Sequence, residues 1–191
     1  MALSRTPRLR GSPISQNSAK ESDLVRELAA DSPDALASLY RMHGRALFRL
    51  ARRLSASVED AEDVLHDLFV GLPEAVRKFD GRGSLEGWLK RVLVRLALMR
   101  QRAQRRRREV AFDDQMPGSA ARHTPDESGA WDVQRVVAGL PEDLRAVLVL
   151  RQTEGYSHNE IAAMLGITPG ASRVRLSRAV KLLRKAMRGR I

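Results

Sequence analysis

Residues 157–187 read SHNEIAAMLGITPGASRVRLSRAVKLLRKAM, and this stretch decides the fold of the second half of the chain. Ser157 and Glu160 have the spacing of a capping box, in which each side chain caps a backbone N–H at the start of a helix. Gly166 stands where a short helix would end, a position that favours glycine because the backbone there is left-handed. Pro169, which follows a threonine, marks a second helix start. The pattern predicts two helices joined by a tight turn, as in helix-turn-helix DNA-binding proteins.

The second of these helices carries only positive charge. Between Pro169 and Ile191 there are eight basic residues and no acidic one. The stripe that we expect to be buried consists of Leu176, Ala179, Val180, Leu183 and Met187, and the exposed face of Arg173, Val174, Ser177, Arg178 and Lys181. A solvated basic helix end is the alternative, because cations stabilise a helix C-terminus. That alternative explains the last arginines but not Arg173, so we predict that this face enters the major groove of DNA.

The composition of the whole chain points the same way. Its 191 residues carry a formal net charge of +11, from 34 lysines and arginines against 23 acidic residues. This excess indicates a polyanionic partner, nucleic acid before an anionic membrane. The absence of cysteine excludes disulfides, Cys-ligated zinc, iron–sulfur clusters and a cysteine nucleophile. Strand-forming residues are scarce and no apolar run approaches the ~20 residues that span a bilayer. We therefore predict an all-α protein with no membrane insertion.

The remaining sequence shows further helix starts. Ser22, Ser32, Ser57 and Ser84 each precede an apolar stripe of helical period, and Pro73 is expected to end or kink its helix. We predict two small helical domains joined by a flexible linker. The expected organisation is a disordered basic arm at 1–21, a first domain at 22–110, a linker at 111–129 and a second domain at 130–191.

Four large side chains in the first half bear on the core and on base stacking. Tyr40, Trp88 and Met99 fall on the apolar stripes and are expected in the core. Phe79 stands beside a loop with two glycines, where core packing and stacking on a base are equally good interpretations. Stacking on a base remains the alternative for Trp88.

Residues 59–80 form an acidic belt in a basic protein. Asp63 and Asp67 are four residues apart and therefore lie on one face of the expected helix. Acidic groups there would repel DNA, so we predict that this face docks a protein partner of basic character. The helix that follows becomes steadily more basic and is predicted to face nucleic acid.

Two blocks of the sequence resemble the bacterial sigma-70 family, specifically its small two-domain extracytoplasmic-function (ECF) group. DAEDVLHDLFVGLPEAVRKFD (60–80), followed by GSLEGWLKRVLVRLALMRQR (83–102), resembles sigma region 2. LPEDLRAVLVLRQTEGYSHNEIAAMLGITPGASRVRLSRAVKLLRKAM (140–187) resembles sigma region 4. The resemblance implies a cytoplasmic, non-enzymatic sigma factor without a cofactor. It would bind the β and β′ subunits of the RNA polymerase core and recognise the minus-ten and minus-thirty-five elements of promoter DNA.

The resemblance also implies roles for individual residues. Core binding would involve Asp63, Asp67 and Phe69. Recognition of the minus-ten element, including a base flipped from the stack, would involve Phe79, Asp80, Arg82, Ser84, Trp88, Lys90, Arg91 and Arg95. Recognition of the minus-thirty-five element would involve Ser172, Arg173, Arg175, Ser177, Arg178 and Lys181.

The sequence departs from the family pattern at four positions. The family commonly has Asn at the position of Arg95 and Asp at the position of Met99, so the promoter sequence does not carry over to this chain. Ser172 stands where the family has an apolar residue, and Val174 where it has a small polar one. A slight rotation of the recognition helix would accommodate both.

Two rival functions remain open. A plain helix-turn-helix regulator would use only the second domain and would have no need of the acidic belt. A sigma-like decoy would bind an anti-sigma factor and not DNA, which the basic face from Arg173 to Lys181 disfavours. The family often has an anti-sigma partner, but nothing in the sequence identifies one. An enzyme is disfavoured because no phosphate loop, catalytic triad or metal-ligand motif is evident, and His66 near Glu62 lacks the second motif of a metal-binding bundle.

Overall fold

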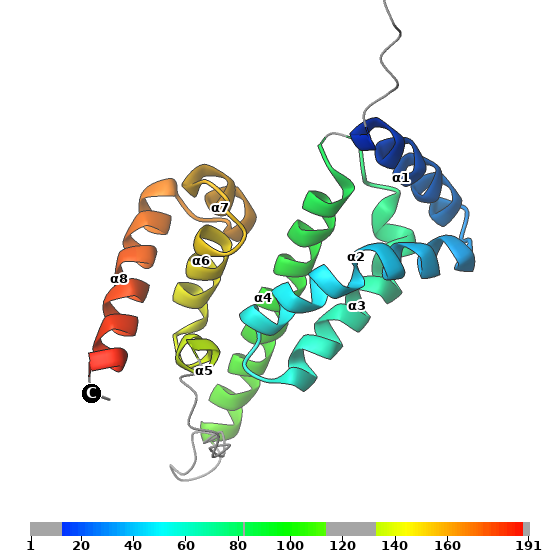
Figure 1. The fold of residues 1–191 in the computed structure, drawn as a ribbon. Helices are drawn as coiled ribbons and strands as arrows, with labels where there is room; N and C mark the ends of the chain where they lie inside the picture. Colours follow the sequence, from blue (N-terminus) through cyan, green and yellow to red (C-terminus); the bar gives the residue numbers. More distant parts are fainter. Residues whose placement is uncertain (1–12, 82, 114–132, 189–191) are drawn as a thin grey trace, which may run out of the picture.

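The structure is a computed structural model that describes residues 13–81, 83–113 and 133–188 (Figure 1). In these residues the chain forms eight α-helices and no strand, which confirms the all-α prediction. The first domain consists of α1 (Pro13–Ala29), α2 (Pro33–Leu54), α3 (Val58–Val76) and α4 (Leu85–Asp113). The second consists of α5 (Val133–Ala138), α6 (Glu142–Gln152), α7 (His158–Leu165) and α8 (Pro169–Arg188). Most of the expected linker and the first twelve residues of the expected arm lie outside the described residues.

Three of the serines that mark helix starts in the sequence do cap helices. Ser32 Oγ accepts a hydrogen bond from the Ala35 N–H at 3.4 Å, and Ser57 Oγ accepts one from the Asp60 N–H at 3.0 Å. Ser84 Oγ accepts one from the Gly87 N–H at 3.1 Å. Each bond satisfies a backbone donor that has no partner within its own helix.

The start of α1 differs from the prediction, and Pro73 does not end its helix. Residues 13–21, expected in the arm, belong to α1, whose start at Pro13 matches the preference for proline in the first turn. The helix α3 continues through Pro73 to Val76. Proline removes one backbone hydrogen bond there, but Leu72 and Val76 on either side are buried in the core. Tertiary packing therefore preserves the last turn of α3.

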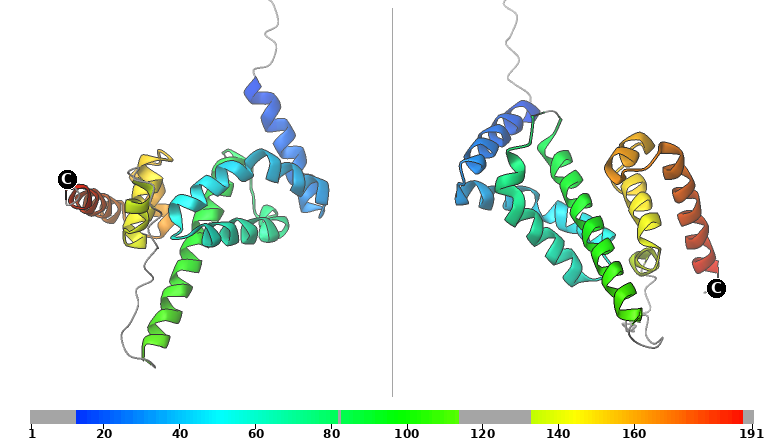
Figure 2. Two further views of the ribbon diagram at one scale, coloured as in Figure 1. Left: turned by 60° about the horizontal axis from the view of Figure 1, so that its bottom comes forward. Right: turned by 180° about the vertical axis from the view of Figure 1, so that it is seen from behind.

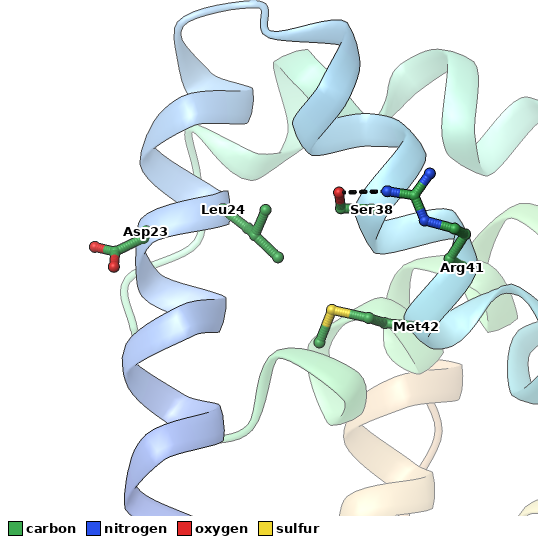
Figure 3. A pocket seen from close by; sticks show the side chains of 5 residues that line it. All are labelled: Asp23, Leu24, Ser38, Arg41 and Met42. Carbon is green, nitrogen blue, oxygen red and sulfur yellow. Dashed lines mark hydrogen bonds between the residues drawn. The ribbon is translucent and has the colours of Figure 1, made fainter.

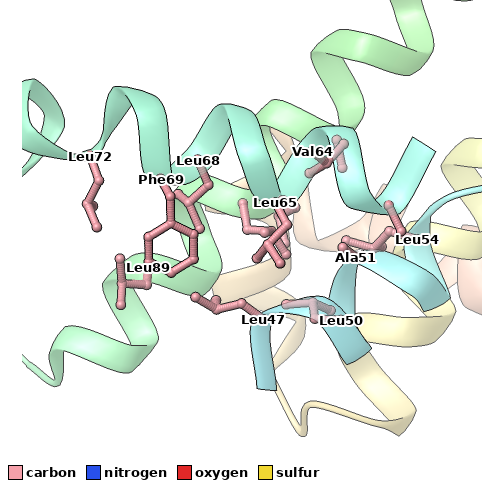
Figure 4. Close-up of a cluster of buried hydrophobic side chains, with 14 of the residues drawn as sticks. Leu47, Leu50, Ala51, Leu54, Val64, Leu65, Leu68, Phe69, Leu72 and Leu89 are labelled. Atoms are coloured by element: carbon pink, nitrogen blue, oxygen red, sulfur yellow. The ribbon is translucent and has the colours of Figure 1, made fainter. Parts of the chain in front are cut away.

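The core of the first domain lies where α2, α3 and α4 face one another (Figure 4). Its labelled side chains are Leu47, Leu50, Ala51 and Leu54 of α2, Val64, Leu65, Leu68, Phe69 and Leu72 of α3, and Leu89 of α4. A Leu→Ala change at a site as fully buried as Leu50 or Leu68 costs about 2–5 kcal/mol. Gln101 of α4 reaches into this region and donates a 2.8 Å hydrogen bond to the Leu54 carbonyl at the end of α2.

Three residues expected in the apolar stripes are exposed instead. Tyr40 is 53% exposed, and its ring packs edge-on against Phe69 with 4.9 Å between centroids. Met99 is 57% exposed because the buried side of α4 is formed by Leu93, Val94 and Ala97. Met187, near the end of α8, is 46% exposed. These three side chains are exposed for one reason: the apolar stripe of a helix includes more residues than the neighbouring helices cover.

The helix α6 is buried on two sides. Leu144 and Leu148 pack with Ala179 of α8 in a small core of the second domain. Val147 and Leu150, both fully buried, belong to a core that is continuous with that of the first domain. The helix α6 packs on α2, and α7 packs on α4 (Figure 2). The two predicted domains are therefore docked against each other.

Among the described helices, none combines the length and the apolar character that a membrane-spanning segment requires.

Candidate DNA-binding and protein-binding surfaces

The helix-turn-helix is held by local hydrogen bonds that the sequence indicates. Ser157 Oγ accepts a hydrogen bond from the Glu160 N–H at 3.3 Å, and Glu160 Oε2 accepts one from the Ser157 N–H at 2.8 Å. These bonds lower the pKa of Glu160 below its ordinary value. Gly166 ends α7 with φ 66°, a left-handed conformation that disfavours other residues. The two helices of the predicted motif are therefore both present, with the predicted turn between them.

The exposed face of α8 presents the cations that the sequence places there. Arg173, Ser177, Arg178 and Lys181 are all exposed, whereas Ala179 on the opposite side is fully buried against α6. Arg175 differs, because its side chain is 31% exposed and forms an ion pair with Asp143 of α6 at 3.4 Å. The structure thus brings four of the six expected residues together on a free face.

Ser172 does not lie on that face. It is fully buried, and its hydroxyl forms a 2.9 Å hydrogen bond with His158 Nδ1 of α7. Partial burial and the positive charges of Arg151 and Arg173 lower the pKa of His158, so the neutral imidazole is favoured. Ser172 therefore holds α7 against α8 at a position where the family has an apolar residue, and its side chain does not lie on the exposed face.

The second cationic surface lies at the start of α4, next to the loop that precedes this helix. Arg91 and Arg95 are exposed on α4, and Asp80 and Ser84 are exposed in the loop. Gly81 and Gly83 adopt φ values of 73° and 81°, which shape the loop and disfavour other residues. Arg82 lies outside the described residues.

The other three residues expected at the minus-ten surface are already engaged within the protein. Phe79 and Trp88 pack against each other, with 5.3 Å between ring centroids, and both contact the core. Core packing, the favoured interpretation of Trp88, is therefore observed. Lys90 Nζ lies 2.9 Å from a carboxylate oxygen of Glu86 and 2.9 Å from one of Glu154, which belongs to the second domain.

The acidic face of α3 is paired with a single arginine of α4. The Arg100 guanidinium forms ion pairs with Asp63 and, through Nη1 at 3.4 Å, with Asp67. The side chains of Asp63 and Asp67 nevertheless remain 54% and 52% exposed. Phe69, by contrast, is buried, and the apolar side chain on the surface beside it is Val70, which is 66% exposed. Val70 and Arg100 were not expected at this face, because an exposed valine carries no charge pattern and helical period does not show which side chains of two helices pair.

A groove of about 450 Å³ lies between α1 and α2 (Figure 3). It is lined by Asp23, Leu24, Ser38, Arg41 and Met42, and Arg41 Nη2 donates a 2.9 Å hydrogen bond to Ser38 Oγ. The groove opens widely to solvent and gathers no set of catalytic groups. Within the part of the chain that the structure describes, no three His, Asp or Glu side chains are grouped as metal ligands would be.

Known proteins match both halves of the chain. The family model for "Sigma-70 region 2" matches residues 39–107, and that for "Sigma-70, region 4" matches residues 130–183. The ECF RNA polymerase sigma factor SigM of Mycobacterium tuberculosis is 32% identical over 159 residues, which cover 83% of this chain and 80% of the relative. The ECF RNA polymerase sigma factor SigE of Mycolicibacterium smegmatis is 36% identical over 153 residues, which cover 76% and 59%.

Two solved structures share the fold. The sigma factor RpoE of Bartonella quintana, in complex with the anti-sigma factor NepR, matches with a TM-score of 0.61 at 26% identity and covers 80% of this chain and 96% of its own. CnrH, in complex with the cytosolic domain of CnrY, matches with a TM-score of 0.58 at 26% identity and covers 88% and 97%.

The chain therefore belongs to the sigma-70 family, in its extracytoplasmic-function group. It is a transcription initiation factor without enzymatic activity, and it directs RNA polymerase to promoters.

Proposed function

We propose that this sigma factor recognises the minus-thirty-five element as duplex DNA with the exposed face of α8. The observation that carries this proposal is the placement of Arg173, Ser177, Arg178 and Lys181 on one side of a helix that packs on α6 with its other side. Arginine donates two parallel hydrogen bonds to guanine in the major groove, and lysine neutralises phosphate. Arg175 contributes charge next to this face, while Ser172 positions α8 from behind.

The minus-ten element is assigned to the start of α4 and its preceding loop. Exposed Arg91 and Arg95 follow the backbone of an unpaired strand, and the Asp80–Ser84 loop lies beside the packed rings of Phe79 and Trp88. A single strand is bound by cations along its phosphates and by surfaces against its bases. This arrangement supports capture of the strand that is released when the promoter melts.

Core polymerase is assigned to the exposed face of α3. Asp63 and Asp67 offer half-exposed carboxylates beside exposed Val70, a combination that suits a partner with both cations and an apolar contact. Arg100 holds the two carboxylates in place until the partner supplies its own cations. Phe69 supports this face from within by packing against Tyr40.

An anti-sigma factor is a further partner that we propose. RpoE and CnrH, which share this fold at 26% identity, are both seen in complexes of this kind: RpoE with the anti-sigma factor NepR, and CnrH with the cytosolic domain of CnrY. Because the family acts with RNA polymerase on promoter DNA, we place the protein in the cytoplasm.

The experiment is in vitro transcription on a promoter library, with core polymerase in the presence and absence of this protein. Discrete start sites that require the protein, each preceded by two shared elements, are the expected result. Arg178→Ala should remove these transcripts, while Arg184→Ala, an exposed residue nearer the C-terminal end of the same helix, should retain them. Core binding without transcripts would instead favour the decoy, and neither core binding nor transcripts would favour a plain DNA-binding regulator.

A further inference from the structure

One carboxylate of region 4 is held by two cations of region 2. Glu154, in the turn between α6 and α7, has a side chain only 10% exposed. Its Oε2 lies 2.9 Å from Lys90 Nζ of α4, and its Oε1 lies 3.4 Å from Arg53 Nη1 near the end of α2. The two cationic side chains are 20% and 34% exposed. The three groups come from three separate parts of the sequence and meet at the interface between the regions.

This pair of cations is built to hold an anion. Burial acts to lower the pKa of Lys90, but hydrogen bonds to Glu154 and Glu86 raise it above the ordinary value, so the ammonium stays charged. An arginine supplies a planar fork and a lysine a compact charge, and both groups bind carboxylate and phosphate oxygens alike. A site that binds a carboxylate between Arg53 and Lys90 therefore also suits a phosphodiester.

The neighbours of Lys90 lie on the surface that we assign to the unpaired promoter strand. Arg91 is the next residue on α4 and is exposed, and Arg95 follows one turn later. Region 4 lies close to this end of α4, because Glu154 contacts Lys90 and α7 packs on α4. Docking of region 4 thus covers part of a cationic track that begins at Arg53 and Lys90.

The docked arrangement cannot persist on a promoter. The two elements are roughly 25 base pairs apart, which is about 85 Å of duplex at ~3.4 Å per base pair. A compact chain of this length has a radius of gyration of only about 16 Å. Reading both elements at once therefore requires region 4 to leave region 2, which breaks the contacts of Glu154.

We propose that Arg53 and Lys90 form a phosphodiester-binding pair for single-stranded promoter DNA, and that Glu154 occupies this pair in place of phosphate while region 4 is docked. The proposal rests on the assignment of α4 to the minus-ten strand and adds Arg53 to it. Glu154 then acts as an internal competitor whose effective concentration is high because it belongs to the same chain. While region 4 is docked, the free sigma factor therefore binds single-stranded DNA weakly. When region 4 leaves, Arg53 and Lys90 become available to bind phosphate.

The test compares the wild-type protein with full-length variants in their affinity for a fluorescent twelve-nucleotide oligodeoxythymidylate. Glu154→Gln keeps the shape of the side chain and removes its charge. We expect it to tighten binding about 3- to 10-fold, since the fraction of molecules with a free cation pair limits the apparent affinity. The slope of log affinity against log salt should steepen by about 0.7 for each additional phosphate bound. Glu27→Gln, at an exposed residue of α1, changes the net charge equally and is the matched control.

The second arm tests Arg53 in both backgrounds. Arg53→Gln should change the affinity of the otherwise wild-type protein by less than twofold, because Glu154 already occupies this side chain. In the Glu154→Gln background the same substitution should reverse most of the gain. A similar loss in both backgrounds would overturn the role of Glu154, and no gain beyond that of Glu27→Gln would overturn the proposal as a whole.

Two further measurements separate this proposal from the assignment of α4. The chain contains no cysteine, so Arg45→Cys on α2 and Ala163→Cys on α7 provide unambiguous sites for a fluorescent distance pair. Saturating oligonucleotide should increase the distance between these labels, and an unchanged distance at saturation would contradict displacement of region 4. Arg91→Gln should weaken oligonucleotide binding in either background. If Arg91→Gln has no effect on oligonucleotide binding, the assignment of α4 to the minus-ten strand is wrong. If Arg91→Gln weakens binding but Glu154→Gln has no effect, only the proposed competition by Glu154 is wrong.

Discussion

The two cationic surfaces of this sigma factor are built from similar residues but differ in what holds them. On α8, Arg173 and Arg178 are exposed, and neither forms an ion pair within the described residues. On α4, Arg91 and Arg95 are exposed as well, but Lys90 beside them contacts two carboxylates. The face of α8 can therefore bind DNA without any rearrangement. Lys90 of α4 must first exchange an internal partner for an external one.

The largest effect should come from reversing the charge of the acidic face of α3, which Arg100 of α4 partly neutralises. Asp63→Lys combined with Asp67→Lys places like charges beside Arg100 and beside any basic partner. We expect core polymerase affinity to fall at least 100-fold, or about 3 kcal/mol, since like charges facing each other across an interface cost several kcal/mol. Fluorescence anisotropy with labelled protein measures the affinity, and circular dichroism checks that the helices remain.

The matched control for this reversal is Glu62→Lys. Glu62 is exposed on the same helix but has no ion pair with Arg100. It should leave core binding within a few-fold of wild type. A double variant that stays helical and binds core normally would remove α3 from the proposed docking surface.

The free surface should respond to the loss of a single side chain. Arg178→Ala should weaken binding to a duplex with the cognate upstream element by about 1–3 kcal/mol, and should affect other duplexes less. Arg184→Ala should weaken binding to every duplex equally, and by less than Arg178→Ala weakens binding to the cognate duplex. It should also reduce the slope of log affinity against log salt by about 1. Electrophoretic mobility shifts at two salt concentrations distinguish the two patterns. An equal loss on every duplex for Arg178→Ala would make it a phosphate contact.

Removing the paired arginine should affect stability more than docking. Arg100→Gln removes ion pairs whose partners are half-exposed, so the free energy of unfolding should fall by only about 1 kcal/mol. Core affinity should not fall, because Asp63 and Asp67 lose an internal competitor. Urea denaturation measures the first quantity and anisotropy the second. Loss of core binding with an intact fold would show that Arg100 itself contacts the polymerase.

The smallest effect concerns pH at the helix-turn-helix. Partial burial, together with Arg151 and Arg173, holds the pKa of His158 below its ordinary value in the folded protein. Below about pH 6.5 the unfolded chain therefore binds this proton more readily, and stability falls as the pH decreases toward the folded pKa. His158→Gln should reduce the drop in urea midpoint between pH 7.5 and pH 5.5. An undiminished drop would assign the pH dependence to other groups.

The sequence predicts well those features that depend on neighbours along the chain. Ser32, Ser57 and Ser84 cap helices at the expected positions because a cap needs only residues about three positions ahead. Gly166 ends α7 for the same local reason. The membership in the ECF group follows from motifs that are also local, and the exposed face of α8 follows from helical period together with the absence of acids.

Predictions that depend on distant partners fare worse. Ser172 is polar and is expected from the resemblance to contact DNA, yet it is fully buried and has His158 of α7 as its partner. Tyr40 and Met99 have the period of core residues, yet both are more than half exposed. Lys90 and Arg91 are adjacent cations that cannot be told apart by sequence, although one is paired across the interface and the other is exposed.

By itself, therefore, the sequence determined that this is an all-α ECF sigma factor, where most of its helices start, and which helices carry which charge. The tertiary structure decided which of those charges are free. When α6 docks on α2, Glu154 meets Arg53, which is 101 positions away in the sequence, and Lys90, which is 64 positions away. Pairing at such separations is set by how whole helices pack, because side chains that are far apart in the chain meet only when burial of apolar surface brings their helices together.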